Sequence, residues 1–413
     1  MYKINQYELA NGIKLISNFD ATTQMVALNF LYDVGSKDEE HGKTGMAHLL
    51  EHLMFTGSAN VAGYDEELQR AGGVSNAWTS QDVTNYYDVL PAQNIETALW
   101  IESDRLLDLT LSDASVETQK SVVIEEFKQR CLNVPFGDLP HLTGAMAYKV
   151  HPYSWPAIGR SVGEIERFTT ADVRKFYEKH YSADKLTICI SGNCRFDKAV
   201  ELTEKWFGDI SPRQCEKRKI TAEPAQCAAR LLRKKNNKVP HNVIVRAYHT
   251  CGRADKEYCT TDLLSDVLAN GQSSRFFQHL VLGTRKFTNA DASITGTFDP
   301  GLLLIRASLA DGVTFDEASA LIDEELAKVL GGDVSDYEVQ KCANKCVATD
   351  ILDNSDYKSV AEKLCTYSLL GDVELINKEH DEYFAVTKQM IEATARNVLQ
   401  QGNCSTLLYG PDA

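Results

Sequence analysis

Residues 25–53 read MVALNFLYDVGSKDEEHGKTGMAHLLEHL, and this stretch decides how the rest of the chain is interpreted. Its apolar beginning predicts a buried strand, its polar middle predicts a loop, and its end has the period of an amphipathic helix. Residues 242–268, NVIVRAYHTCGRADKEYCTTDLLSDVL, repeat this order. The loop residues Gly35, Asp38 and Glu40 correspond to Gly252, Asp255 and Glu257, each at an offset of 217 (252 − 35 = 217).

A second pair of segments indicates that the chain is duplicated. Residues 169–193, TTADVRKFYEKHYSADKLTICISGN, predict a helix, a polar turn and an apolar strand that ends at Gly192. Residues 386–412, VTKQMIEATARNVLQQGNCSTLLYGPD, give the same order, with Gly410 at an offset of 218 (410 − 192 = 218). A unit of about 200 residues indicates duplication of a whole domain, since solenoid repeats have periods of roughly 20–50 residues. The alternative is that the halves share only the order of their strands and helices.

Each half mixes strands with long helical segments, such as the run from Asp336 to Leu370, without strict strand-helix-strand alternation. This arrangement favours the α+β class, with two homologous domains that each pack a largely antiparallel sheet with helices. The segment 210–226 is charged, carries two prolines and lacks apolar periodicity. We therefore expect the boundary there, with domains 1–215 and 216–413.

Composition and charge exclude several kinds of partner. The net charge of −15 argues against nucleic acid, because phosphate binding needs a concentrated excess of Lys and Arg. No stretch approaches the roughly 18 apolar residues that span a bilayer, and the residues after Met1 lack the basic and apolar regions of a signal peptide. Eleven scattered cysteines, an odd number, fit reduced thiols. We expect a cytoplasmic protein that binds neither nucleic acid nor membrane.

The helical end of the opening stretch contains HLLEH, in which His48, Glu51 and His52 can face one point. Two histidines four residues apart can bind one Zn²⁺, and the glutamate beside them can take a proton from water. Such a site needs a third protein ligand. The helical segment VVIEEFKQR offers Glu125 and Glu126, and geometry alone does not choose between them. The alternative is that both histidines belong to an ordinary core or interface.

Seven segments, in order along the chain, carry a resemblance to a known family: NGIKLI, GMAHLLEHLMFTGS, GGVSNAWTSQDVTNYYDVLP, VVIEEFKQR, HPYSWPAIG, LTICISGN and GQSSRFFQHL. Together they resemble the inverted-zincin metallopeptidases of the pitrilysin, insulin-degrading enzyme and mitochondrial processing peptidase family. The resemblance covers nearly the whole chain and favours the branch with bacterial processing peptidases. It implies a zinc-dependent endopeptidase that hydrolyses peptides or unfolded polypeptides, with zinc in domain 1–215 and none in domain 216–413.

The resemblance also implies roles for individual residues. His48 and His52 match the first two zinc ligands, and Glu51 matches the general base. Glu126, 74 positions after His52 (126 − 52 = 74), matches the third ligand better than its neighbour does. The family often has a further glutamate two helical turns earlier, where this chain has Gln119. An outer carboxylate is thus missing, which would tune metal affinity or water activation differently.

The segment SNAWTS, with Asn76, Ala77 and Trp78, resembles the edge strand on which this family lays an extended substrate. Backbone pairing with such a strand gives affinity with little sequence selectivity. The alternative is an ordinary half-buried strand.

The second half departs from the pattern of active relatives. Those relatives carry an arginine and a tyrosine, seven residues apart, that hold the substrate, whereas the corresponding positions here are Val281 and Thr288. We therefore expect the zinc-bearing subunit of a dimer, either a heterodimer whose homologous partner supplies the arginine and tyrosine, or a homodimer with altered substrate contacts. The competing hypothesis is a non-catalytic scaffold or partner subunit of a peptidase-like complex.

Overall fold

The computed structural model describes residues 1–213 and 218–413, so the predicted boundary between 215 and 216 lies outside the described residues. The chain forms two compact units, each considered by itself. The first comprises Met1–Arg130, Trp155–Thr221 and Ile351–Asn377, and the second comprises Cys131–Ser154, Ala222–Asp350 and Lys378–Ala413. Within the described part of the chain, no helix is both long enough and apolar enough to cross a membrane.

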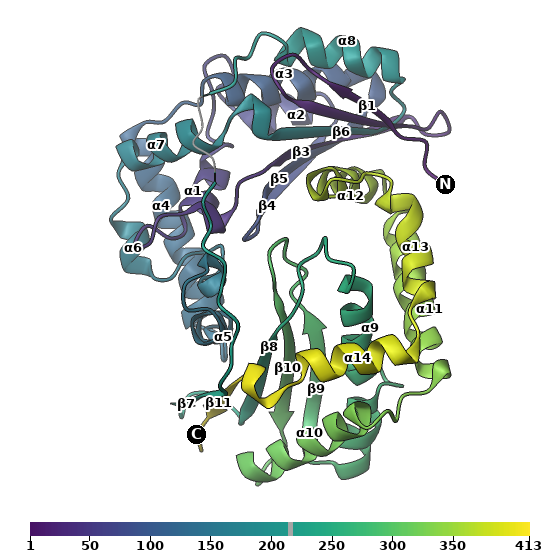
Figure 1. Ribbon diagram of the computed structural model, residues 1–413. Helices are drawn as coiled ribbons and strands as arrows, with labels where there is room; N and C mark the ends of the chain where they lie inside the picture. The colour runs from purple at the N-terminus through teal and green to yellow at the C-terminus, as the bar shows by residue number, and fades with distance from the viewer. Residues whose placement is uncertain (214–217) are drawn as a thin grey trace. The chain divides into compact units, whose positions relative to one another are not determined.

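The first unit is built on a sheet of six strands in the order β1-β2-β6-β3-β5-β4 (Figure 1). One neighbouring pair, β2 and β6, is parallel, and the other pairs are antiparallel. The strands are β1 (Asn5–Glu8), β2 (Lys14–Phe19), β3 (Met25–Tyr32), β4 (Val74–Thr79), β5 (Thr84–Pro91) and β6 (Leu186–Gly192). Its helices are α1 (Met46–Leu53), α2 (Tyr64–Arg70), α3 (Ile95–Leu107), α4 (Asp113–Phe127), α6 (Val162–Glu166), α7 (Thr170–His180), α8 (Phe196–Phe207) and α12 (Tyr357–Leu370).

Helices cover both faces of this sheet. Successive side chains of a strand point to opposite faces, so helices on both sides are needed to bury them. On one face, Phe30 of β3 stacks on Phe207 of α8. On the other face, α12 packs on β3 and β6, and Asn85 of β5 donates to Glu362 of α12 at 3.3 Å. The buried core strands β3 and β6 therefore fix the centre of the unit, and β4 lies at one edge.

The second unit contains a five-stranded sheet in the order β7-β11-β8-β10-β9. Its strands are β7 (Arg230–Lys235), β8 (Val243–His249), β9 (Phe287–Ile294), β10 (Leu302–Leu309) and β11 (Cys404–Gly410). Its helices are α5 (Leu139–Ala147), α9 (Tyr258–Ala269), α10 (Phe315–Leu330) and α14 (Lys388–Val398), with a π-helix at Phe276–Thr284. The helices α11 (Asp336–Asp353) and α13 (Leu375–Ala385) run across the divisions between the units.

The two sheets repeat one topology. In each, a single parallel pair (β2 with β6, β7 with β11) continues into antiparallel strands in corresponding order. The predicted loop repeat is also present, since Gly35 N–H donates to Asp38 at 3.0 Å and Gly252 N–H donates to Asp255 at 2.8 Å. A Cβ on Gly35 would lie 2.5 Å from a carbonyl oxygen, and one on Gly252 would lie 2.4 Å from another, so both loops need glycine. The α+β prediction, with largely antiparallel sheets, is confirmed.

Each of the two units is made of several separate segments of the sequence, so no single boundary divides them. Segment 131–154, which contains α5, packs in the second unit, and segment 351–377, which contains α12, packs in the first. The predicted helical run from Asp336 to Leu370 is two helices, because α11 ends at Asp353 and α12 begins after Asp356, whose side chain accepts the Lys358 N–H. The homologous domains 1–215 and 216–413 stay a prediction about duplication, and they differ from the packing units in these two segments.

Candidate metal centre

The first part of the site is carried by α1, a helix of eight residues. Leu49, Leu50 and Leu53 are fully buried and hold the helix against the core. The remaining face presents His48, Glu51 and His52. His48 and Glu51 are each only 8% exposed, so this face lines a recess rather than open surface.

Glu126 comes from α4, which lies beside α1 (Figure 1). Ser112 is the N-cap of this helix, and its hydroxyl accepts the Ser115 N–H. Val116, Val123 and Phe127 are buried along one side and fix the rotation of α4.

The neighbouring glutamate lies outside the cluster. The carboxylate of Glu125 is 63% exposed and pairs with Lys128 at 2.6 Å. The structure therefore brings Glu126, and not Glu125, to the histidines.

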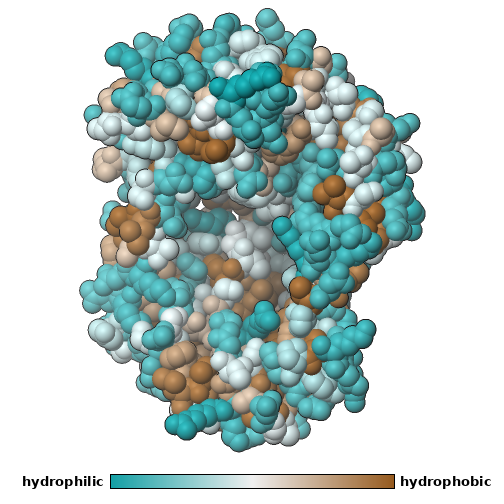
Figure 2. Space-filling view, turned by 180° about the vertical axis from the view of Figure 1, so that it is seen from behind, coloured by the Kyte–Doolittle hydropathy of each residue, from teal (hydrophilic) through white to brown (hydrophobic). Residues whose placement is uncertain are grey.

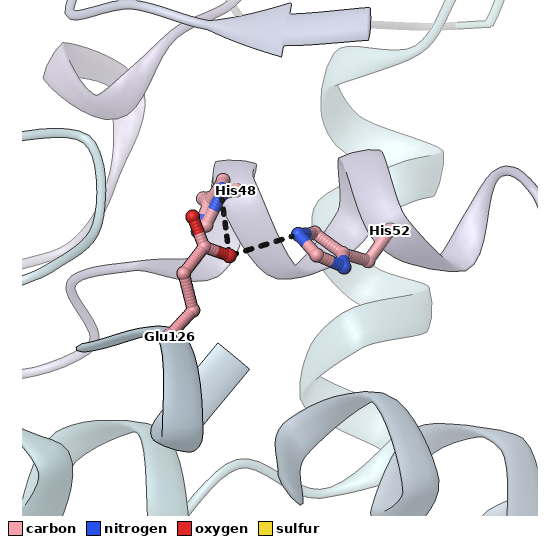
Figure 3. Close-up of side chains that lie close together, drawn as sticks. All are labelled: His48, His52 and Glu126. Carbon is pink, nitrogen blue, oxygen red and sulfur yellow. Dashed lines mark ion pairs between the residues drawn. The ribbon is translucent and has the colours of Figure 1, made fainter. Parts of the chain in front are cut away.

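Three side chains converge between α1 and α4 (Figure 3). Oε2 of Glu126 lies 3.7 Å from Nε2 of His48 and 3.4 Å from Nε2 of His52. One ligand atom from each residue lies within 4.8 Å of the other two. Ligand atoms of a tetrahedral zinc site with bonds of about 2.0–2.1 Å are about 3.3 Å apart. The three residues therefore fit one zinc ion, and three protein ligands would leave one position for water or substrate.

The electrostatics of the cluster suit a divalent cation. Burial lowers the pKa of His48 to about 4, which keeps its imidazole neutral near pH 7. A hydrogen bond with His52, together with the nearby His48 and Arg130, lowers the pKa of Glu126 and keeps it ionised. Neutral imidazole and ionised carboxylate are the forms that bind metal.

One of the two histidines lacks the usual second hydrogen bond of a metal ligand. Nδ1 of His48 is buried and has no hydrogen-bond partner among the described residues. Metal-binding histidines usually donate this second N–H to a carboxylate or carbonyl, which fixes the ring. Gln119 lines the same groove as the cluster. It stands at the position where, by the resemblance, related proteins often carry a further glutamate. The orientation of His48 therefore depends strongly on α1 itself.

Glu51 is held apart from the three ligand atoms. Thr79 Oγ1 at the end of β4 donates to Glu51 Oε2 at 2.5 Å. Burial raises the pKa of Glu51, and the Thr79 hydrogen bond opposes that rise. A buried carboxylate with one oxygen occupied by a donor retains its other oxygen for proton transfer.

An open groove joins these groups. It is lined by His48, Glu51, His52, Phe55, Asp65, Ser75, Asn76, Ala77, Trp78, Thr79, Gln119, Glu126 and Arg130. The predicted metal, base and substrate residues of the first half thus share one groove.

Asn76, Ala77 and Trp78 lie on β4, an edge strand of the six-stranded sheet. The Ala77 N–H donates to the side chain of Asn76 at 2.8 Å, so a local contact occupies this backbone donor. Trp78 is 38% exposed, and its indole N–H donates to Glu362 at 3.4 Å. The strand offers a free edge beside the cluster, as strand addition requires.

The sequence reasoning missed two residues of the site. Arg130 pairs with Glu126 Oε1 at 2.8 Å and so leaves Oε2 to face the histidines. Their spacing of four residues on one helical segment was an available signal. Thr79, by contrast, reaches Glu51 across 28 residues of sequence, and no local pattern predicts that contact.

Val281 and Thr288 lie in the second unit. Val281 packs against the apolar core of that unit, and the Thr288 hydroxyl donates to the Ser308 carbonyl at 3.3 Å. Neither side chain offers the charge of an arginine or the reach of a tyrosine. Among the described residues of the second unit, no group of His, Cys, Asp or Glu resembles the metal cluster.

Comparison with known proteins decides the family. The profile described as insulinase (peptidase family M16) matches residues 14–134, and the profile described as the peptidase M16 inactive domain matches residues 167–346. The chain belongs to peptidase family M16. The predicted resemblance is thereby confirmed, and the matched ranges place the first profile over the metal cluster and the second over both Val281 and Thr288.

Related proteins match between half and nearly all of the chain. The zinc protease PqqE of Helicobacter pylori is 27% identical over 410 residues, which is 98% of this chain and 92% of that protein. The mitochondrial-processing peptidase subunit beta of Saccharomyces cerevisiae is 29% identical over 208 residues, 49% of this chain and 44% of that protein. The crystal structure of a protease from Helicobacter pylori, 26% identical, superposes with a TM-score of 0.92 over 99% of this chain and all of that chain.

Proposed function

We propose that this chain is a cytoplasmic, zinc-dependent endopeptidase that cleaves peptides or unfolded polypeptides in extended form. The observation that carries the proposal is the position of the cluster. Two histidines and an ionised carboxylate converge in an open groove, beside a buried glutamate and a free strand edge. Membership in family M16 and relatives named as zinc proteases support a peptidase.

His48, His52 and Glu126 would hold the zinc ion. When bound, zinc supplies Lewis acidity that polarises a peptide carbonyl and lowers the pKa of water. Glu51 accepts the proton of the attacking water and then passes it to the leaving amine. Thr79 holds one oxygen of Glu51, so that the other can face the reacting water.

The substrate would extend the six-stranded sheet along β4. Main-chain hydrogen bonds to the free edge would position any extended peptide, so we expect a broad substrate range. Asn76 occupies the Ala77 N–H at 2.8 Å, and substrate displaces this local bond when it pairs. Trp78 adds an aromatic surface next to the strand.

A homologous partner would complete the substrate site. Support comes from Val281 and Thr288, which stand where active relatives carry arginine and tyrosine, and from relatives named as subunits of a processing peptidase. A homodimer with other substrate contacts is the second form of this proposal. The non-catalytic scaffold remains the competing function, and the same two residues favour it.

Hydrolysis of a mixed peptide library by the Glu51→Gln variant tests the proposal. We expect this variant to keep its zinc and to lose at least about 100-fold in rate, which is the contribution of a positioned general base. Glu125→Gln is the matched control and should cleave at the parental rate, because that side chain is exposed and pairs with Lys128. Cleavage by zinc-loaded Glu51→Gln at the parental rate would contradict the mechanism. A parent that binds zinc and cleaves nothing, alone or with its homologous partner, would favour the scaffold.

A further inference from the structure

Glu39 is a buried carboxylate at the start of the helix that carries the histidines. Only 7% of the residue is exposed. Its Oε2 accepts the Gly45 N–H at 3.0 Å, and its Oε1 accepts the Ala47 N–H at 2.9 Å. Helices leave the N–H groups of their first turn without partners inside the helix. Glu39 therefore takes the part of a capping side chain, which the glycine at the N-cap of α1 does not have.

The carboxylate is itself anchored from the far side. Trp155 Nε1–H donates to Glu39 Oε2 at 3.0 Å and lies 3.2 Å from the Ser36 carbonyl, which it also contacts as a donor. Burial raises the pKa of Glu39 to about 8, and the three donors oppose that rise. Since every partner is a donor, the ionised form is the one that satisfies all three hydrogen bonds.

The loop that leads into α1 has little freedom. Gly45 has a φ of 92°, and a Cβ there would lie 3.0 Å from the Ile158 carbonyl oxygen. The N–H and hydroxyl of Thr44 both donate to Glu164, at 3.0 and 2.6 Å. Contacts with Glu164 and with the Ile158 carbonyl therefore restrict the loop before α1. Glu39 binds the N–H groups at the start of the helix.

A small rotation of α1 would change the distances between the histidine nitrogens and the Glu126 carboxylate. A helix of eight residues is too short to be stable on its own, so its buried face and the contacts at its ends together decide its rotation. A side-chain atom about 6 Å from the helix axis moves by about 1 Å when the helix turns by 10°. Metal sites tolerate deviations of only about 0.2 Å from ideal ligand distances.

From these contacts we propose that Glu39 is a positioning residue for the metal centre. By fixing the first turn of α1, it sets where His48 and His52 lie relative to Glu126. It acts through the backbone of α1 and is not a ligand. The inference rests on the proposed zinc site and extends it to a residue outside the HLLEH motif.

The test compares Glu39→Gln with Glu223→Gln in the full chain. Glutamine keeps the size of the side chain but places an N–H₂ group against backbone donors. Glu223 is the matched control because it accepts the N–H groups of three consecutive residues, at 2.8, 2.9 and 3.0 Å, in the second unit. Zinc affinity is measured by competition with a chelator, and coordination geometry by the visible spectrum of the cobalt(II)-loaded protein. Both are recorded at a temperature where circular dichroism shows each variant folded.

We expect Glu39→Gln to bind zinc at least tenfold more weakly and to give an altered cobalt(II) spectrum, while Glu223→Gln stays within twofold of the parent. An unchanged affinity and spectrum in folded Glu39→Gln would overturn the inference. If that variant does not fold, Glu39→Asp replaces it: the shorter side chain keeps the charge but cannot reach both N–H groups, and parental zinc affinity in it would equally overturn the inference. A parent that binds no zinc would instead refute the proposed site.

Discussion

At the scale of single residues, Glu51 and Glu126 are two carboxylates that their surroundings make different. Burial raises the pKa of Glu51, whereas the hydrogen bond with His52 lowers the pKa of Glu126. A proton acceptor benefits from a raised pKa, and a metal ligand benefits from a lowered one. The surroundings of Glu51 therefore suit a proton acceptor, and those of Glu126 suit a metal ligand.

Replacement of Thr79 by valine tests how Glu51 is oriented. The variant removes the donor that lies 2.5 Å from Glu51 and keeps the shape of the side chain. Since a hydrogen bond to a charged group contributes roughly 1.5–3 kcal/mol, we expect kcat to fall by about tenfold or more. Zinc content should not change. Ser75→Ala, in the same strand and groove, serves as control, and equal rates for both variants would contradict the orienting role.

His180 on α7 gives a prediction about pH. Burial lowers its pKa to about 3, below the 6.5 of an exposed histidine. The unfolded chain therefore binds a proton between pH 6.5 and 3 that the folded protein does not bind, and stability falls as the pH drops through this range.

His180→Phe removes this titration and keeps a ring next to Phe176, whose centroid lies 4.5 Å away. Urea unfolding at pH 4, 5, 6 and 7 should give a shallower dependence of the unfolding free energy on pH, by up to about 1.4 kcal/mol per pH unit. A slope equal to that of the parent would show that His180 does not contribute.

The sequence predicted that His48, His52 and Glu126 lie together, but it did not predict the contacts that surround them. Spacing on one helix was enough to group His48 and His52, and the resemblance chose Glu126 over Glu125. The contacts of Glu51 with Thr79 and of Glu39 with Trp155 join residues 28 and 116 positions apart. Such contacts depend on how the sheet and loops pack, and no periodic pattern encodes them.

At the scale of elements, the repeated strand-loop-helix pattern predicted the central strands and their order of appearance. It did not predict that α5 and α12 would pack away from the sequence halves in which they lie. Each helix buries residues along one side. An apolar face in the sequence does not specify which of two sheets the helix will cover. The break at residues 354–356 was missed because the apolar pattern continues on both sides of it.

Leu364→Ala tests the placement of α12. Leu364 is fully buried, and α12 packs on β3 and β6. Removal of a buried leucine side chain should cost about 2–5 kcal/mol, and the loss should appear as faster amide hydrogen exchange in β3 and β6.

Leu352→Ala is the control, because Leu352 is 72% exposed on α11 and should change stability by less than about 0.5 kcal/mol. Faster exchange in β10 with unchanged protection of β3 would contradict the described packing of α12.

At the scale of the whole molecule, the two units share a topology but not a chemistry. The first contains the cluster, the groove and the free edge of β4, and the second has the same strand order with Val281 and Thr288 at the positions expected to hold substrate. Figure 2 shows a mainly hydrophilic face on which hydrophobic residues form small separate groups, consistent with a net charge of −15. Among the described residues the candidate metal cluster lies in the first unit alone, which is why a homologous partner enters the proposal.

The central claim is that HLLEH and Glu126 form one zinc site, and zinc stoichiometry tests it most directly. We predict about one zinc per chain for the parent and for Glu125→Gln, and at least about tenfold weaker binding for Glu126→Gln, since a ligand is lost. The adjacent pair makes the comparison strict, because the two variants have the same composition and differ by one position. Parental zinc binding by Glu126→Gln, or its loss in Glu125→Gln, would contradict the site.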